Sequence, residues 1–237
     1  MPIDKYLEKI QGARSFHKFV NPVPYEFIEN PENYVILEGR SHKTFSYPNL
    51  LVSMERSHYN LTWLETLKIL HQEDSVMLNL RQYIDFLNIL KSGTAYDANG
   101  DRIFEEKVVE ILNNIYAVRD PWRAEWLNNK FTIRGETTTL DYYKFNSEGQ
   151  PIIMPDKLDQ DTLMEDKQID LDEWLSDANS QGLPRKDIAS GNVYFWYLRE
   201  GGATWFNANS GGIDLILHGS PSFLATWLGV RPAKLIK

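Results

Sequence analysis

Apolar side chains recur every three or four residues in three consecutive stretches of the chain, which predicts three amphipathic helices. The first stripe is Trp63, Leu67 and Leu70, the second is Leu80, Tyr83, Ile84, Leu87 and Leu90, and the third is Phe104, Val108, Ile111, Leu112 and Ile115. We expect the second helix to end at Gly93 and the third to begin near Asp101. Because no polar ligand residue interrupts the stripes, we interpret all three as core.

Strand patterns flank these helices on both sides. Residues 34–39 and 50–58 precede them, and residues 131–134 and 140–145 follow. The last third of the chain has strand patterns at 192–198, 203–206, 214–217 and 226–230, separated by turns that include Gly201-Gly202 and Gly211-Gly212, which we read as hairpin turns. This order predicts an α+β fold that ends in an antiparallel sheet, with no βαβ repeat.

The chain reads as one domain with an N-terminal extension. Residues 1–33 contain Pro22, Pro24 and Pro31, which favour a short helix followed by an extended arm. Residues 34–237 show no linker strong enough to divide them. Within this domain, residues 156–173 are predicted to form a long acidic surface loop, with carboxylates at Asp156, Asp159, Asp161, Glu165, Asp166, Asp170, Asp172 and Glu173.

Charge and composition exclude several classes of function. The net charge of −8 and the pI near 5.2 argue against nucleic acid or an anionic membrane as partner, since phosphates are bound by clusters of Lys and Arg. The absence of cysteine excludes disulfides, thiol nucleophiles and thiolate metal sites. The first residues have no apolar core typical of a signal peptide, and no later run has membrane-spanning length, so we expect a soluble chain without membrane insertion.

No motif in the chain indicates catalysis. The five histidines are scattered, no glycine-rich phosphate loop is followed by a helix, and neither Ser210 nor Ser220 lies in a Gly-x-Ser-x-Gly turn. The acidic residues 156–173 could hold calcium, but they lack the regular Asp-x-Asp-x-Asp-Gly spacing, and the favoured interpretation is a solvated charge run. We expect no enzyme activity, no cofactor and no metal.

The stretch from Thr204 to Val230 differs in composition from the rest of the chain. It contains 27 residues and one full charge, Asp214, in a chain that is 24% charged. It also has no Lys, Arg, Glu, Gln or Met. Depletion of charge is typical of the centres of binding interfaces, and a buried sheet would show it too.

The same stretch carries a recognisable pattern of residues. The pattern consists of Phe206, Ala208, Ser210, Leu215, Pro221, Ser222 and residues 228–231, preceded by residues 191–197 and, further back, by residues 119–127. It resembles the variable proteins of diversity-generating retroelements, of the type found in archaea and archaeal viruses. The resemblance covers most of the chain from about residue 45.

This resemblance implies a C-type lectin-like fold related to the formylglycine-generating enzyme, with helices packed on small antiparallel sheets and a variable ligand-binding region at about 202–227. The matched residues would form a fixed framework. The positions between them would be variable and would bind ligand: Trp205, Asn207, Asn209, Gly211, Gly212, Asp214, Ile216, His218, Gly219, Ser220, Phe223, Leu224 and Trp227.

The codon logic of the family agrees with part of this composition. Adenine-directed mutation of codons that begin with two adenines and end with a pyrimidine never yields Lys, Glu, Gln or Met, and the stretch lacks all four. The absence of Arg is not explained in this way, and Trp205 and Trp227 cannot arise from such codons. Leu217 also departs from the family, in which many members have Cys at that point, and Trp227 stands where Ala often precedes the Leu-Gly-Val run.

We compare three candidate functions. The leading one is a non-enzymatic receptor or attachment protein, displayed on a virion or a cell surface, whose variable face binds a protein or a glycan. Two alternatives are a calcium-dependent lectin of fixed specificity and a relative of the formylglycine-generating oxidases. The copper-binding cysteines of those oxidases are missing, which makes such a relative catalytically inactive.

Overall fold

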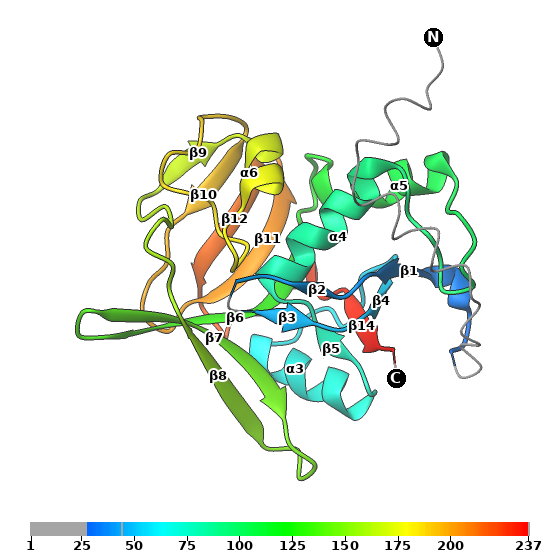
Figure 1. The fold of residues 1–237 in the computed structure, drawn as a ribbon, viewed down its shortest axis with the longest axis horizontal. Coiled ribbons are helices and arrows are strands. Elements are labelled where there is room, and N and C mark those ends of the chain that lie inside the picture. Colours follow the sequence, from blue (N-terminus) through cyan, green and yellow to red (C-terminus); the bar gives the residue numbers. More distant parts are fainter. Residues whose placement is uncertain (1–27, 44, 237) are drawn as a thin grey trace.

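The computed structural model describes residues 28–43 and 45–236, and these residues form a mixed α+β fold (Figure 1). The α-helices within them are α3 (Trp63–Gln72), α4 (Leu80–Ser92), α5 (Glu105–Tyr116) and α6 (Leu171–Asp177), and a short 3-10 turn, η1 (Pro31–Asn33), precedes the first strand. The α+β class predicted from the sequence is therefore confirmed. The expected helix and arm in residues 1–27 lie outside the described residues.

Two sheets contain most of the strands (Figure 1). The smaller one is antiparallel, with the order β1 (Tyr34–Leu37), β4 (Leu50–Ser53), β14 (Pro232–Leu235) and β5 (Val76–Met77). The larger one has the order β8 (Pro151–Lys157), β7 (Thr137–Phe145), β6 (Arg123–Arg134), β11 (Ala203–Asn209), β12 (Gly212–Gly219), β10 (Val193–Trp196) and β9 (Lys167–Ile169), with β13 (Leu228–Gly229) beside β6. A separate ribbon pairs β2 (Arg40–Ser41) with β3 (Ser46–Tyr47).

The C-terminal strands do not form the purely antiparallel sheet that the sequence suggested. β10 pairs in parallel with β12, and β13 pairs in parallel with β6. The reason is that β12 lies between β10 and β11, so the segment from β10 to β11 crosses over instead of turning back. Gly201-Gly202 is therefore not a hairpin turn, whereas Gly211-Gly212 does connect the antiparallel strands β11 and β12.

The three predicted helices are present, and their apolar stripes are buried apart from the N-terminal residue of the third and its half-buried Leu112. α4 begins at a capping box, in which Asn79 and Gln82 exchange bonds with each other's backbone N–H, and it ends at Gly93 with φ 67°, as expected. α5 begins at Glu105, later than predicted. The backbone of Asp101 is held in a turn by the Asp97 carboxylate, and this leaves Phe104 as the N-cap residue, 82% exposed.

The strands β6 and β7 are longer than their apolar pattern indicates. Two asparagines inside β6, Asn128 and Asn129, obscure the strand signal, but both are buried and bonded. The Asn128 amide donates to the Tyr143 carbonyl and accepts from the Tyr143 N–H, and Asn129 accepts from the Leu80 N–H at the start of α4. The strand therefore continues through these polar residues, because their side chains bond to backbone groups that would otherwise lack a partner.

Residues 156–173 are not one long loop. They contain the end of β8, the whole of β9 and the start of α6. Local hydrogen bonds explain the difference, since Asp170 caps α6 by accepting from the Glu173 N–H, and β9 pairs with β10. Carboxylates that form a charge run in the sequence therefore serve in the structure as a helix cap or as members of ion pairs.

Helices cover the two faces of the large sheet unequally. α4, α5 and α6 pack with one face of β10, β12 and β11 in the main core, which includes Phe195, Phe206 and Leu215 (Figure 1). On the other face, α3 contributes Trp63 and Leu70 to a smaller cluster with Trp126 of β6. No helix in the described part of the chain is long and apolar enough to cross a membrane.

Candidate functional site

Side chains of the hairpin β11–β12 alternate between the core and the opposite side of the sheet. Phe206, Ala208 and Leu215 are buried in or against the main core, while the intervening residues project from the other side. We call this other side the outer sheet face and define it by ten residues: Tyr194 and Trp196 of β10, Asp214, Ile216 and His218 of β12, Trp205, Asn207 and Asn209 of β11, and Ala124 and Trp126 of β6.

The strand register arranges this face in rows across four strands. One row runs Trp126, Trp205, Ile216 and Trp196, so that two tryptophans are neighbours on β6 and β11 and Ile216 on β12 separates them from the third, on β10. The next row runs Ala124, Asn207, Asp214 and Tyr194. Neighbours in a row are about 4.8 Å apart along the sheet, which brings their side chains into contact distance.

Four aromatic side chains form a cluster around Trp205 of the first row, which we call the aromatic cluster: Trp122, Trp205, Phe223 and Trp227. Ring centroids lie 5.2 Å apart for Trp122 and Trp227, 5.7 Å for Phe223 and Trp227, and 5.6 Å for Trp205 and Phe223. Trp122 is 40% exposed and Phe223 is 39% exposed. Large aromatic side chains left at the surface in contact with one another are typical of binding sites.

The loop that carries Phe223 and Leu224 is anchored on the first residue of α3 and on the segment just before it. The Pro221 carbonyl accepts from the Trp63 N–H at 3.1 Å, and the Ala225 carbonyl accepts from the Asn60 N–H at 3.1 Å. Leu224 between these anchors is 48% exposed. The loop is therefore held in place by its backbone while its side chains face solvent.

Asp214 forms the polar centre of the outer sheet face. It is 8% exposed and accepts a hydrogen bond from Trp196 Nε1 at 2.9 Å and another from the Asn209 amide. With its amide nitrogen turned toward Asp214, the orientation that satisfies both ends, Asn207 donates to Asp214 Oδ2 at 3.1 Å and accepts from Asn209 at 3.1 Å. These three neutral donors fix the carboxylate in one position.

The structure separates the thirteen candidate ligand-binding residues into two groups. Most are exposed or half-buried on the outer sheet face or in its adjoining turns: Trp205, Asn209, Gly211, Gly212, Ile216, His218, Ser220, Phe223, Leu224 and Trp227. Asn207 and Asp214 are buried beneath them. Gly219 is also buried, and a Cβ atom there would lie 2.4 Å from the Trp205 ring, so a side chain at 219 requires that ring to move.

Two exposed aromatic residues of this face were not among the candidates. Tyr194 is 39% exposed and Trp196 is 37% exposed, and their rings stack with centroids 6.3 Å apart. The alternation of apolar and aromatic residues in 193–196 carried the signal, because a strand buried on one face exposes every second side chain. Trp122 was missed for a different reason, since it precedes β6 and reaches the face only through its contact with Trp227.

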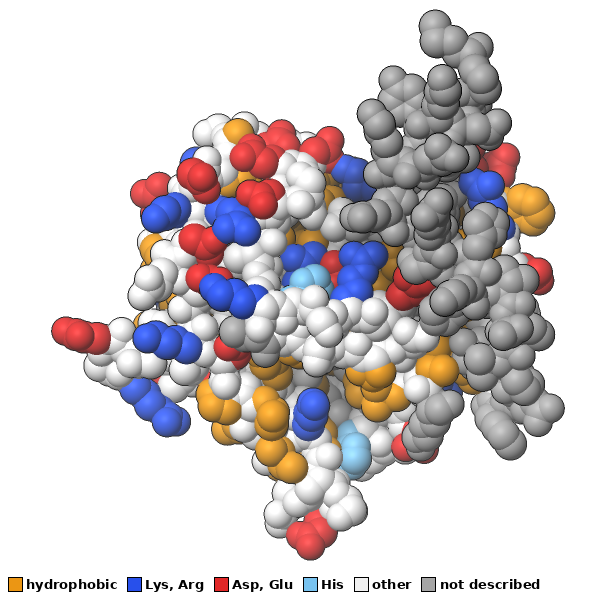
Figure 2. All heavy atoms as spheres, in the orientation of Figure 1, with side chains coloured by type: hydrophobic (Ala, Val, Ile, Leu, Met, Phe, Trp, Pro, Cys, Tyr) orange, Lys and Arg blue, Asp and Glu red, His pale blue; other side chains and the backbone are white. Residues whose placement is uncertain are grey.

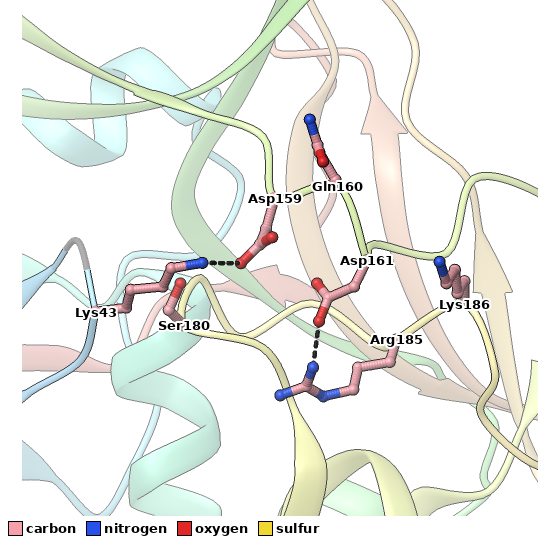
Figure 3. A pocket seen from close by; sticks show the side chains of 7 residues that line it. All are labelled: Lys43, Asp159, Gln160, Asp161, Ser180, Arg185 and Lys186. Atoms are coloured by element: carbon pink, nitrogen blue, oxygen red, sulfur yellow. Dashed lines mark hydrogen bonds and ion pairs between the residues drawn. The ribbon is translucent and has the colours of Figure 1, made fainter.

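A polar pocket of about 430 Å³ lies elsewhere, between the loops around Asp159 and Arg185 (Figure 3). Lys43 faces Asp159 at 3.7 Å, and Arg185 faces Asp161 and Asp177. The acidic side chains of the pocket are therefore already paired with cations. Within residues 28–43 and 45–236 no three His, Asp or Glu side chains are grouped as a metal site would need.

A buried charge cluster holds the ribbon β2–β3 against α4. Asp85 is 1% exposed and accepts from Tyr47 Oη at 2.6 Å, Arg81 at 2.8 Å, His42 at 2.9 Å and Arg40 at 3.3 Å. Burial, and after it the charge of Asp85, raises the pKa of the Tyr47 hydroxyl. Every oxygen of this carboxylate is used within the protein, so we interpret the cluster as structural.

A second exposed apolar region lies on the edge strand β8, where Ile152, Ile153 and Met154 are 44%, 51% and 45% exposed. Figure 2 shows hydrophobic side chains gathered over the lower part of the molecule, where β7 and β8 lie. Asn146 and Leu158 each donate a backbone N–H to a residue on the opposite arm of the hairpin. With the register of β7 and β8, these bonds mean that the backbone N–H and C=O groups of the odd-numbered β8 residues face the open edge. Two of these are Pro151 and Pro155, which lack an N–H, so the edge is protected against addition of another strand.

No protein-family model matches the chain, and no curated protein or solved structure matches it either.

Proposed function

We propose that the chain is a non-enzymatic ligand-binding protein that recognises its target with the outer sheet face and the aromatic cluster. In this proposal it is a variable protein of a diversity-generating retroelement, with a C-type lectin-like fold and a variable region at about 202–227. It would act as a receptor or attachment protein, displayed on a virion or a cell surface.

The observation that carries the proposal is the alternation along β11 and β12. Three residues of the framework pattern, Phe206, Ala208 and Leu215, are buried on the core side. Their neighbours in the sequence face the other way, where substitution does not disturb the main core. This is the arrangement that a binding surface with changeable side chains on a fixed scaffold requires.

The burial of individual positions refines the proposed variable set. Ile216, Phe223 and Leu224 reach solvent and are suited to contact a ligand. Asn207 and Asp214 are buried and bond to each other and to Asn209, so they would act by holding neighbouring side chains in place. The calcium-dependent alternative gains no support, because Asp159, Asp161 and Asp170 are engaged in ion pairs or a helix cap.

The experiment that tests the proposal is sequencing of the gene, its flanks and the corresponding genes of close relatives. We expect a reverse-transcriptase gene nearby and a second copy of the segment that encodes residues 203–230, differing from it at adenines. Differences among relatives should concentrate at codons for exposed outer-face positions such as 209, 216 and 223. Differences spread equally over the codons of Phe206, Ala208 and Leu215 would contradict the proposal.

A further inference from the structure

The outer sheet face has a negative charge that no cation of the face balances. Of its ten residues, Asp214 is the one Asp, Glu, Lys or Arg, and the adjoining loop 220–227 has none. Beyond the end of β10, the surface carries Arg199 and Glu200 in the loop to β11 and Asp166, which accepts from the Tyr197 N–H. On the side of the face next to Tyr194 and Trp196, the rim therefore adds no net positive charge.

The surroundings of Asp214 differ from those of two other buried carboxylates. Asp85 is paired with Arg81, and Glu125 is paired with Arg231 at 2.7 Å. Asp214 instead accepts only from the neutral donors Trp196, Asn209 and Asn207 among the described residues. A buried carboxylate without a cation keeps an uncompensated charge, and a ligand that brings a positive group close to it gains that interaction.

Two aromatic rings stand next to this charge on the exposed side. Tyr194 is the cross-strand neighbour of Asp214, and its ring lies over Gly212, within 3.6 Å of where a Cβ would be. Trp196 stacks on Tyr194 and donates to Asp214. The faces of such rings attract cations, most strongly the planar guanidinium of arginine.

The hydrogen-bonding groups of the face are largely used within the protein. The Asn209 oxygen accepts from the Gly211 N–H at 2.6 Å, its nitrogen donates to Asp214, and Ser220 and Ser222 bond to each other at 2.9 Å. Sugar hydroxyls need several free donors and acceptors, and these amide and hydroxyl groups are already bonded. What it offers is aromatic surface beside a negative charge.

We propose that the partner is a protein segment that presents an arginine or lysine side chain, and that its cationic group lies against the rings of Tyr194 and Trp196 next to Asp214. This inference rests on the proposed function, and it names the chemical class of the ligand. The remaining contact area comes from the aromatic cluster, which suits the aliphatic parts of the same segment.

The test uses two short peptides that differ in charge and not in shape: acetyl-Gly-Arg-Gly-amide and the same peptide with citrulline in place of arginine. Binding to the full chain is followed by NMR of the tryptophan indole N–H signals, with Trp196 assigned from its Phe variant. We expect the arginine peptide to bind at least about threefold more tightly, as an exposed cation on aromatic rings does. Added salt should reduce this difference.

Asp214→Asn is the decisive variant, because the amide oxygen can still accept from Trp196 while the charge is lost. We expect it to remove the preference for arginine over citrulline. Asp141→Asn is the matched control: Asp141 is also buried and accepts from two neutral hydroxyls, those of Thr132 and Thr139, but it lies on β7, separated from β11 by β6. If Asp214→Asn fails to fold, Trp196→Leu against Trp196→Phe tests the contribution of the ring.

Equal affinity for the two peptides, an unchanged preference in Asp214→Asn, or no shift of the indole signals with either peptide would overturn the inference. Methyl glycosides serve as the comparison probe. If they shift the Trp196 and Trp205 signals and the arginine peptide does not, the face binds sugars, so the ligand class is wrong while the binding function stands. The gene comparison described above decides the proposed function separately from both results.

Discussion

The buried hydroxyl of Tyr83 makes the stability of the protein depend on pH. Its ring is fully buried and lies 5.6 Å from the ring of Phe206, on the core side of β11, and its hydroxyl has no hydrogen-bond partner in the structure. Burial first, and then the charge of Glu125, raises the pKa of this hydroxyl well above its ordinary value of 10.0. The folded chain therefore keeps the proton at a pH where the unfolded chain releases it.

We predict that Tyr83→Phe stabilises the protein or leaves it unchanged at pH 7, because it removes an unpaired buried hydroxyl whose burial costs about 1 to 3 kcal/mol. A pKa that is raised in the folded state gives stability that is fully present below the unfolded pKa. This stability is lost as the pH rises from the unfolded pKa through the folded pKa. The advantage of the variant should therefore grow from pH 9 to pH 11. Urea unfolding at both values measures this, with the exposed Tyr194→Phe as control, and an advantage that stays constant with pH would contradict it.

At the scale of the element, two helices begin with the same motif in different surroundings. The capping box of α4 is formed by Asn79 and Gln82, which are 4% and 9% exposed. The box of α3 is formed by Thr62 and Glu65 at the surface. Loss of a cap leaves a backbone N–H unpaired, and water can reach that group only in α3.

We predict that Asn79→Ala costs about 2 kcal/mol of unfolding free energy and Thr62→Ala about 1 kcal/mol or less, the upper and middle parts of the range for cap removal. Each variant is the control for the other, since both remove one side-chain acceptor from a helix N-terminus. Chemical denaturation followed by circular dichroism measures the difference. Equal costs would show that exposure of the cap does not decide its contribution.

Sequence patterns located the helices better than the strands for a physical reason. A stripe such as Leu80 to Leu90 repeats with the period of the helix, and it is buried against several neighbours at once. The neighbours of a strand are distant in sequence, so the place of β12 between β10 and β11 could not be predicted from either strand alone. Asn128, which bonds to Tyr143 across the sheet, has a strand role that appears only with its partner.

The sequence could indicate which segment holds the candidate site, but it could not indicate which residues share the surface of that site. Charge depletion and the resemblance pointed to residues 202–227, and in the structure the strands of this segment alternate between the core and the outer sheet face. Trp122 belongs to the surface because it contacts Trp227, and Gly219 is restricted because Ala203 and Trp205 surround it. Both facts depend on tertiary contacts that no local pattern records.

At the scale of the whole molecule, one buried ion pair joins the two sheets. Arg231, just before β14 of the smaller sheet, is 2% exposed and donates to both oxygens of Glu125 on β6, at 2.7 and 3.2 Å. It also donates to the carbonyls of Ser53 and Met54 at the end of β4. Burial is the largest single effect on this group and lowers its pKa, but the attraction and hydrogen bonding of Glu125, together with the nearby Tyr83 and Tyr59, outweigh it and raise the pKa of Arg231.

We predict that Arg231→Met costs about 3 to 5 kcal/mol, because it leaves the Glu125 carboxylate buried with only the more distant Arg56, at 3.7 Å. Adding Glu125→Gln removes the stranded charge, so the double variant should cost less than the sum of the two single ones. The control is Lys234→Met, which replaces a half-buried cation on β14, the strand that follows Arg231, and should cost less than about 1 kcal/mol. Urea denaturation of the four variants decides: additive costs, or an Arg231→Met loss no larger than that of Lys234→Met, would mean that the sheets are held together by apolar packing alone.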